Sequence, residues 1–503
     1  MTSNAPPLCV VMACAAPVAR RARYALDSLM MAAGIRVEYV SSPPTNGPWL
    51  LYGSSKAGWP QAWQGLAIAC CDSAWAVFDN AQDATGVDRI QGLPVVAPGS
   101  VNGADADITF DLLANSFFFL SSWSERVTAQ VHGSRRLYQD SVFKRLGLPQ
   151  DIVDRYLEHL LSGLNALCAR LGVAAWPAVG WPRGADFAVV LSHDVDFLPA
   201  GPGDIAVQGV KTFMRHLVRQ RDPADALRSL GGLARACAAG RDPYGCIPHM
   251  LEQERRLGVR ASYQVAVARR HAADVNYRIE DDRVRNYLRA IVEAGFDLCL
   301  HGSYRSTEND AWYEEEVELL ASRLARPLGS RQHFLSFDID RLFKAQERSG
   351  IEYDMSMGYP DQTGPRAGFS HPYFPYNPIE DRPYRVLQIS LVLMDVTLRG
   401  YMNLRPDAAW PVIERELLAL SRRRGCASAV WHPIVFAGAR DPGYDRLFWR
   451  LVDHVTQNNG LATDGATVNR HWRERAAHYA SFGAGEQRTL TADMNLPQQV
   501  NQR

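Results

Sequence analysis

The sequence predicts an α/β protein in which a smaller α/β unit precedes a long series of alternating strands and helices. Short apolar segments rich in β-branched residues recur between residues 187 and 463, and amphipathic segments with helical spacing separate them. Such β–α repeats are typical of a parallel sheet or a (β/α) barrel. At 503 residues the chain is also too long for one ordinary domain.

The composition is that of a globular protein without a dominant charge. Hydrophobic residues make up 47% of the chain and charged residues 21%, which excludes disordered and fibrous classes. The 54 basic and 54 acidic residues cancel, so no overall field favours nucleic acid or an anionic membrane. We therefore expect no nucleic-acid partner.

The cysteines and the apolar segments predict a cytoplasmic location. Nine cysteines form no C-x-x-C motif and cannot all pair within the chain, which is typical of a reducing compartment. The N-terminus lacks the basic region of a signal peptide. No run approaches the roughly eighteen apolar residues of a transmembrane helix. A membrane-attached substrate is compatible with this prediction.

Residues 1–171 are predicted to form the first, smaller unit. Apolar spacing predicts helices over residues 20–33, 110–120 and 151–171, the last closed by Gly172. Short apolar pieces at 35–39, 49–52, 66–70 and 74–78 alternate with Pro, Gly and Asn and predict small α/β structure with short strands. His132 is interpreted as a surface or hydrogen-bonded residue rather than a ligand.

Residues 172–184, with two Trp-Pro pairs, look like the join to a second domain, predicted at 185–478. Strands are expected at 187–192, 260–267, 296–301, 330–333, 351–354, 386–390, 426–432 and 461–463. Helices are expected at 282–294, 308–326, 338–349, 408–424 and 444–459. A basic helical insertion at about 201–248 is interpreted as a solvated face, with a binding lid as the alternative. Residues 479–503 are expected to be a flexible tail.

Ionisable residues directly follow four of the predicted strands. The first strand ends in His193-Asp194-Val195-Asp196, and later strands end in His301, in Arg331-Gln332-His333 and in His432. Strand ends converge at one face of a barrel, so these side chains are expected to meet. Oxygen and imidazole ligands suit zinc, cobalt or another transition ion. A further carboxylate and a further histidine can then act as general base and general acid.

The same residues resemble the motifs of the polysaccharide deacetylases of carbohydrate esterase family four. Asp194-Val195-Asp196 is similar to the Asp-x-Asp that one branch of that family has, and His301 begins a segment similar to its second motif. The resemblance implies a distorted (β/α) barrel that removes N-acetyl groups from sugars with a bound metal. It implies that Asp194 is the base, that Asp196 and His301 bind metal, that Arg331 orients the base and that His432 is the acid.

The second motif is incomplete, because Arg305 stands where that family has its second histidine. Either His333 or His193 then supplies the third ligand, or the metal is weak or absent. His333 is favoured, since His193 alternates away from Asp194 on an ideal strand. The predicted metal ligands are thus Asp196, His301 and His333.

Aromatic residues and prolines gather between residues 353 and 376 and are interpreted as a sugar-binding rim. Alternatively they form a rigid loop packed against the barrel. Arg366, Tyr359, Tyr373 and Ser303 are the predicted substrate contacts, and Arg366 in particular is expected in the pocket. Asp395 follows another strand and is predicted to be the partner of His432.

The first unit resembles an accessory domain that precedes some bacterial deacetylase-like proteins. Residues 110–113, 117–120 and 123–125 carry this resemblance, and no activity follows from it.

These observations favour a metal-dependent hydrolase that removes an N-acetyl group from a sugar of an oligosaccharide, glycolipid or polysaccharide precursor. One alternative is a non-catalytic carbohydrate-binding or assembly protein that has lost the metal. Another is a hydrolase of a non-sugar C–N bond, similar to allantoinases. The sequence leaves open the sugar, the linkage, the metal and the oligomeric state.

Overall fold

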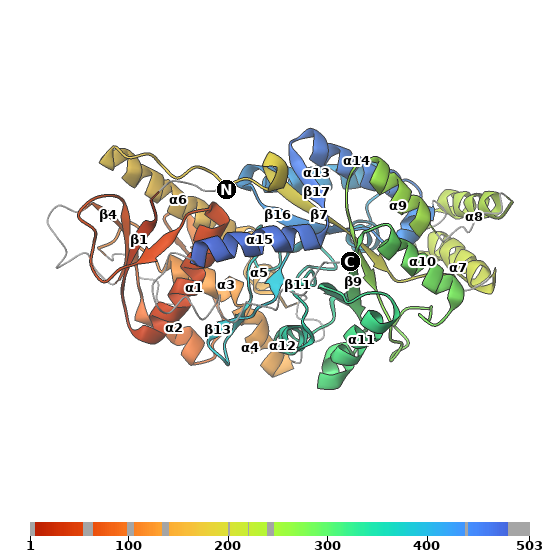
Figure 1. Ribbon diagram of the computed structural model, residues 1–503, viewed down its shortest axis with the longest axis horizontal. Helices are drawn as coiled ribbons and strands as arrows, with labels where there is room; N and C mark the ends of the chain where they lie inside the picture. Colours follow the sequence, from red (N-terminus) through yellow and green to blue (C-terminus); the bar gives the residue numbers. More distant parts are fainter. Residues whose placement is uncertain are drawn as a thin grey trace, which may run out of the picture.

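The computed structural model has a small parallel sheet and a larger one that curls into a distorted barrel (Figure 1). It describes residues 6–53, 64–97, 105–132, 140–199, 202–219, 221–238, 246–437 and 441–480. Most of the predicted tail, from residue 481 onward, lies outside this range, and residues 479 and 480 belong to the last helix. The α/β class and the barrel predicted from the sequence are confirmed.

The first sheet contains four parallel strands in the order β2-β1-β3-β4. Its strands are β1 (Leu8–Ala13), β2 (Val37–Tyr39), β3 (Trp49–Gly53) and β4 (Gly65–Ala69), and a small antiparallel pair, β5 (Asp88–Ile90) and β6 (Leu93–Val95), follows. The helices are α1 (Ala16–Ala33), α2 (Asp72–Asp79), α3 (Leu112–Leu120), α4 (Trp123–His132), α5 (Val142–Arg145) and α6 (Ile152–Leu171).

Several elements of this unit differ from the sequence-based expectation, which included no strand at β1 and no helix at α4 or α5. The central strand β1 was not predicted, because its apolar run was interpreted only as a poor signal peptide. Residues 74–78, expected among the short strands, lie in helix α2, whose buried residues Ala74, Trp75, Val77 and Phe78 follow helical spacing. The predicted helix 151–171 is confirmed as α6, and Gly172 ends it in the left-handed conformation with φ of 68°.

The larger sheet is parallel, with strands in the order β14-β11-β10-β9-β8-β7-β16-β15. Its strands are β7 (Phe187–Val195), β8 (Ser262–Val265), β9 (Asp297–Gly302), β10 (Gly329–Gln332), β11 (Tyr353–Asp354), β14 (Leu387–Gln388), β15 (Leu391–Met394), β16 (Cys426–Val430) and β17 (Gly460–Thr463). β17 pairs with the first half of β7 and β8 with the second half, which distorts the barrel.

One continuous segment joins the two ends of this sheet. The N–H of Ile389 donates to the carbonyl of Asp354 beside β11, whereas the carbonyl of Ser390 accepts from Ser428 in β16. The sheet therefore curls back on itself, and the carboxyl ends of its strands lie on one face.

Helices surround the barrel and link it to the first unit. They are α7 (Pro202–Met214), α8 (Pro223–Ala238), α9 (Ile247–Arg256), α10 (Asp282–Glu293), α11 (Asp310–Arg323), α12 (Ile339–Ser349), α13 (Pro406–Arg423), α14 (Tyr444–Gln457) and α15 (Gly465–Ala480), with a π-helix, η2 (Arg215–Arg219), between α7 and α8. Short helical turns lie at η1 (Pro182–Gly184), η3 (Ser306–Glu308), η4 (His333–Leu335), η5 (Thr397–Tyr401) and η6 (Pro433–Ala437), and a hairpin at β12 (Tyr376–Asn377) and β13 (Arg382–Pro383).

Helix α15 runs from the barrel back toward the first sheet (Figure 1). Its Trp472 stacks on the buried Trp181 of the joining segment, with ring centroids 5.7 Å apart. Val468 and Trp472 belong to the same hydrophobic core as residues of the first sheet and of the barrel. The core of the first unit is therefore continuous with part of the barrel.

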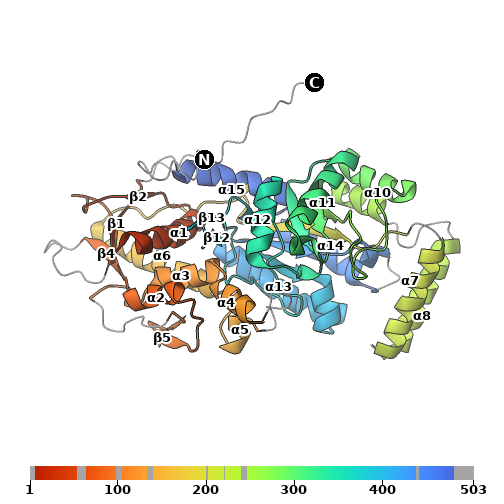
Figure 2. The same cartoon turned by 90° about the horizontal axis from the view of Figure 1, so that it is seen from below.

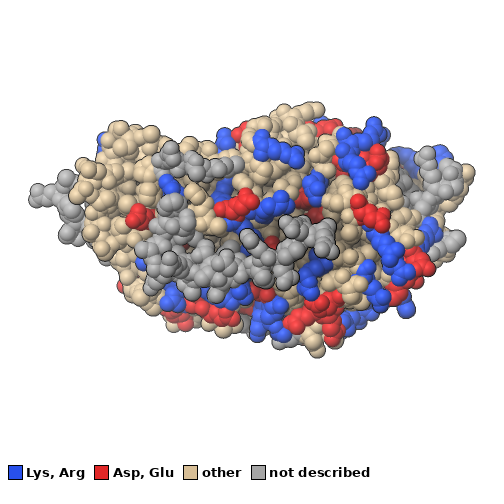
Figure 3. All heavy atoms as spheres, in the orientation of Figure 1, with Lys and Arg blue, Asp and Glu red and all other residues tan. Residues whose placement is uncertain are grey.

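The surface and the cysteines show two further features. On the face in Figure 3, basic and acidic side chains are interspersed. All nine cysteines are free thiols. Among the described helices, none has the length and apolar character to cross a membrane.

Candidate active site and metal centre

A cavity of about 380 Å³ opens at the carboxyl ends of the barrel strands. It contains residues from the four strand ends predicted to meet there, since β10 and β9 are neighbours, β7 and β16 are neighbours, and only β8 separates the two pairs. The lining residues are Asp194, Asp196, His301, Tyr304, Gln332, His333, Phe334, Leu335, Ser336, Pro360, Met394, Val396, Tyr401 and His432.

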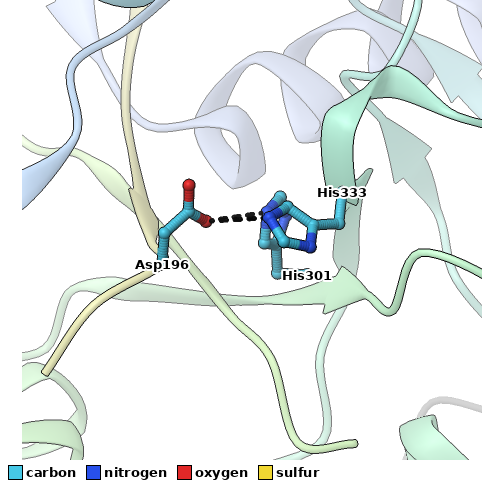
Figure 4. A group of neighbouring side chains, drawn as sticks. All are labelled: Asp196, His301 and His333. Atoms are coloured by element: carbon cyan, nitrogen blue, oxygen red, sulfur yellow. Dashed lines mark ion pairs between the residues drawn. The ribbon is translucent and has the colours of Figure 1, made fainter. Parts of the chain in front are cut away.

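Asp196, His301 and His333 point toward one another at this cavity (Figure 4). One ligand atom from each residue lies within 4.8 Å of the others. Asp196 Oδ1 is 3.2 Å from His301 Nε2 and 3.7 Å from His333 Nε2. The three residues predicted as metal ligands therefore form one group.

The hydrogen bonding of this group fits a metal ion. His301 Nδ1 lies 3.0 Å from the carbonyl oxygen of Arg331, which can only accept, so Nδ1 carries the proton. The lone pair of Nε2 then faces Asp196 Oδ1, and neither atom makes a hydrogen bond to the described residues. A cation between two buried acceptors satisfies both, and a backbone partner on the other ring nitrogen is typical of metal-bound histidines.

Asp274 supports the third donor and was missed by the sequence analysis. Its Oδ1 lies 3.9 Å from His333 Nδ1 and accepts the N–H of Tyr304. Its Oδ2 accepts the N–H groups of Arg270 and His271. The signal was weak, because Asp274 lies in a loop nine residues after the end of β8 rather than at the strand end.

Asp194 is fixed by Arg331. The guanidinium Nη1 donates to Asp194 Oδ1 over 2.5 Å, Nη2 donates to Ser192 Oγ, and Nε donates to the carbonyl of Met355. Arg331 is fully buried and Asp194 is 4% exposed. The carboxylate thus has a fixed orientation at the edge of the cavity, as predicted for the Arg331–Asp194 pair.

His432 lies between two carboxylates. Its Nδ1 is 2.7 Å from Asp395 Oδ1, and its Nε2 is 3.3 Å from Asp196 Oδ2. Burial lowers the pKa of the imidazole, but Asp395 and Asp196 outweigh it and raise this pKa to about 10. For the Asp395 carboxyl, burial raises the pKa, but His432 and Arg399 lower it by more. The pKa of Asp395 therefore lies below its ordinary value. The predicted pairing of Asp395 with His432 is confirmed by this contact.

Of the two histidines considered as third ligand, His333 lies beside Asp196 and His301 at the cavity, and His193 does not. His193 is buried on the other side of β7, with Nδ1 2.7 Å from the carbonyl of Trp431 and Nε2 2.7 Å from Glu254 Oε1. It is therefore fully engaged away from the cavity. Arg305 is partly exposed and lies 3.8 Å from Glu308, and it is not among the residues that line the cavity.

No protein-family model and no curated protein matches this chain. Among solved structures, it is similar to a putative polysaccharide deacetylase from Mycobacterium smegmatis, with 16% identity, a TM-score of 0.40, and coverage of 59% of this chain and 94% of that one. It is similar to Puue allantoinase, with 15% identity, a TM-score of 0.38 and coverage of 58% and 92%. It is also similar to a probable polysaccharide deacetylase from Pseudomonas aeruginosa PAO1, with 16% identity, a TM-score of 0.37, and coverage of 58% of this chain and 93% of that one.

The four predicted substrate contacts lie outside the cavity. Arg366 is buried and donates from Nε and Nη2 to both carboxylate oxygens of Glu125 in α4, at 2.7 Å each. The Tyr359 hydroxyl contacts Ser141 Oγ, and Ser303 donates to the buried Glu316. Tyr373 is 2% exposed and pairs through its backbone with Gln388.

The predicted substrate contacts of the aromatic segment lie outside the cavity because this segment packs against the first unit instead of facing solvent. Asp154 of α6 accepts hydrogen bonds from the backbone and hydroxyl of Ser370, and the Tyr24 hydroxyl of α1 donates to the carbonyl of Phe374. The expectation that Arg366 lies in the pocket is wrong. The segment is packed, as in the alternative, but these contacts are with the first unit and not with the barrel. The first unit covers a segment that the sequence alone leaves looking like a binding rim.

Other aromatic residues line the cavity. Phe334 is 60% exposed and Tyr401 is 54% exposed. Phe334 has a φ of 57°, an uncommon conformation for a bulky side chain, and packs on His333 with centroids 4.5 Å apart. The sequence analysis did not select Phe334, although its position directly after His333 could have indicated that it lies at the cavity.

We expect Glu125→Ala to lower the free energy of unfolding by about 3 kcal/mol, because it leaves the buried Arg366 guanidinium unpaired. Chemical denaturation measures this change. Glu318→Ala, which removes an exposed ion pair with Arg326, serves as the control and should cost less than about 1 kcal/mol. Equal losses in the free energy of unfolding for the two substitutions would show that the Arg366–Glu125 ion pair does not stabilise the contact between the units more than a surface pair does.

Proposed function

We propose that this protein is a metal-dependent hydrolase that removes an N-acetyl group from a sugar of an oligosaccharide, glycolipid or polysaccharide precursor. One observation carries the proposal. A group of three metal-type donors, a carboxylate fixed by a buried arginine and an imidazole fixed by a buried carboxylate all face the same cavity. Metal-dependent amide hydrolysis uses these three kinds of group together.

Asp196, His301 and His333 would hold the ion, which we propose to be zinc, with cobalt or another transition ion as alternatives. When bound, such an ion polarises the acetyl carbonyl and lowers the pKa of water. Three protein ligands leave a position for water or substrate, as in catalytic zinc sites.

The protein groups then handle the protons. Asp194 accepts a proton from the water that attacks the acetyl carbon, and the hydrogen bond from Arg331 keeps this carboxylate oriented. The protonated Nε2 of His432 donates to the amide nitrogen as the C–N bond breaks, which releases acetate and a free amine. Asp395 accepts the Nδ1 proton and so directs Nε2 toward the cavity.

The exposed rings of Phe334 and Tyr401 support a sugar substrate, because pyranose C–H faces stack on aromatic rings. A non-sugar C–N bond is the second candidate, favoured by the apolar lining that Leu335, Met394 and Val396 provide. The position of His333 beside Asp196 and His301 argues against the non-catalytic alternative, because its imidazole offers a donor that Arg305 does not.

We further propose that residues 1–171 act as an accessory domain of the barrel at residues 185–478. The nine free thiols support a reducing, cytoplasmic setting.

The experiment is an assay of acetate release by zinc- or cobalt-loaded protein from a panel of N-acetylhexosamine oligosaccharides and glycolipids. A matched panel of non-sugar amides and ureides is assayed alongside. We expect release from at least one glycan, its loss on chelation and its recovery with metal. Turnover of the non-sugar panel alone would favour the second candidate, and no turnover of either panel would overturn the proposal.

A further inference from the structure

A helical hairpin projects from the barrel at the end of the molecule opposite the first sheet (Figures 1 and 2). It consists of α7, the π-helix η2 and α8, which pack on one another. Helix α7 begins at Pro202, six residues after Asp196 at the carboxyl end of β7, so the hairpin starts on the side of the barrel that carries the cavity.

Both helices of the hairpin expose apolar side chains. Val210 and Val218 are each 63% exposed, and Leu227 is 67% exposed. Their neighbours at helical spacing are exposed as well, which gives one apolar stripe on each helix: Val207, Val210, Met214, Leu217 and Val218 on the first, and Leu227 and Leu230 on the second. Small or polar residues such as Thr212, Ala226 and Ser229 are buried instead. Ile205 and Leu233 pack against the buried Ile434 of the barrel. The hairpin is therefore apolar on an outer face in addition to the face that holds it to its own domain.

The charges beside these stripes are mainly basic. In residues 202–238 there are six Lys and Arg residues and three Asp residues. Asp222 and Asp225 form ion pairs with Arg405 and Arg228. The basic side chains at the surface of the hairpin are Lys211, Arg221, Arg228 and Arg235. Exposed apolar side chains beside Lys and Arg complement the interface of an anionic bilayer.

Ion pairs connect the π-helix η2, at the turn of the hairpin, to the cavity. Arg215 Nη2 is 2.7 Å from Asp441 Oδ1, and Arg399 Nη1 is 3.0 Å from Asp441 Oδ2. Arg399 also lies 3.6 Å from Asp395, the partner of His432. The hairpin thus has a defined orientation relative to the cavity.

We propose that this hairpin docks the protein on an anionic membrane surface, with the apolar stripes at the acyl boundary and the basic side chains on lipid phosphates. Docking would hold the cavity near the bilayer. If the proposed function is correct, and this step rests on it, the substrate is then a membrane-anchored N-acetylated sugar.

The test is flotation of the full-length protein with vesicles of phosphatidylcholine alone or of an equimolar mixture with phosphatidylglycerol. We expect binding to the mixed vesicles that weakens with salt, and weaker binding to phosphatidylcholine alone. The triple variant Val210→Ser, Val218→Ser and Leu227→Ser should bind the mixed vesicles at least about tenfold more weakly than wild type. Ile379→Ser, at an 83% exposed position in the β12–β13 turn, is the matched control and should bind normally.

Three results would overturn the docking proposal. The first is wild-type protein that fails to float with the mixed vesicles, and the second is a triple variant that floats as well as wild type. The third is light scattering that finds a wild-type dimer and a monomeric triple variant, which would show that a second copy covers the stripes. Acetate release from a soluble oligosaccharide should be unchanged in the triple variant. Since flotation requires no turnover, failure of docking and failure of the proposed function are distinguishable.

Discussion

Asp194→Asn should reduce acetate release about 1,000-fold or more while the protein still binds its metal ion. Asparagine can still accept the hydrogen bond from Arg331, but it cannot take a proton from water. General-base catalysis contributes about 100- to 10,000-fold to such reactions. Steady-state kinetics and metal analysis of the same preparation measure both effects.

Asp196→Asn provides the comparison for this prediction. Asp196 belongs to the metal-type group and Asp194 does not, so we expect only the Asp196 variant to lose metal. Asp282→Asn, at an exposed position on α10, controls for the loss of a negative charge and should remain active. An Asp194→Asn variant with near-normal turnover would show that another group activates the water.

The second large effect is expected for His333→Ala, which should weaken zinc binding by at least about 100-fold. Its Nε2 is one of three donors, and loss of residues that only support a ligand already costs about 10- to 100-fold in affinity. Zinc titration with a competing chelator measures the change.

Arg305→Ala is the matched control for His333→Ala, because Arg305 occupies the motif position where a second histidine was expected. It lies beside Glu308 and outside the cavity lining, so zinc affinity should be unchanged. His193→Ala should also keep zinc, since His193 pairs with Glu254, but it should be less stable. Loss of zinc in either control variant would contradict the ligand set proposed here.

Much of the barrel could be predicted, because its pattern is local. A buried parallel strand is a continuous apolar run, and an amphipathic helix shows its period within a few turns, so each unit is visible in a short window. The residues that line the candidate site could be predicted for a similar reason, because they directly follow the strands. In a parallel sheet, side chains after successive strands reach one edge, so Asp194, Asp196, His301, Arg331, His333 and His432 could be grouped before any coordinates.

The expectations that the structure overturned failed because they depend on contacts between distant parts of the chain. Arg366 and Tyr359 were expected at a binding rim, yet they are buried against Glu125 and Ser141 of the first unit. An aromatic, proline-rich segment has the same composition whether it faces a ligand or another part of the chain. Asp274 was missed because its role depends on a loop that returns to His333.

The sequence by itself therefore determined the α/β class, the order of the barrel elements and the residues at the strand ends, since each follows from local periodicity and parallel-sheet geometry. Only the tertiary structure decided between His333 and His193, because ring direction depends on partners such as Trp431 and Glu254 that are distant in sequence. It alone showed that the first unit covers the aromatic segment and that the hairpin exposes its apolar stripes. Burial is a property of the assembled fold, and no local pattern specifies which surface another part of the chain will cover.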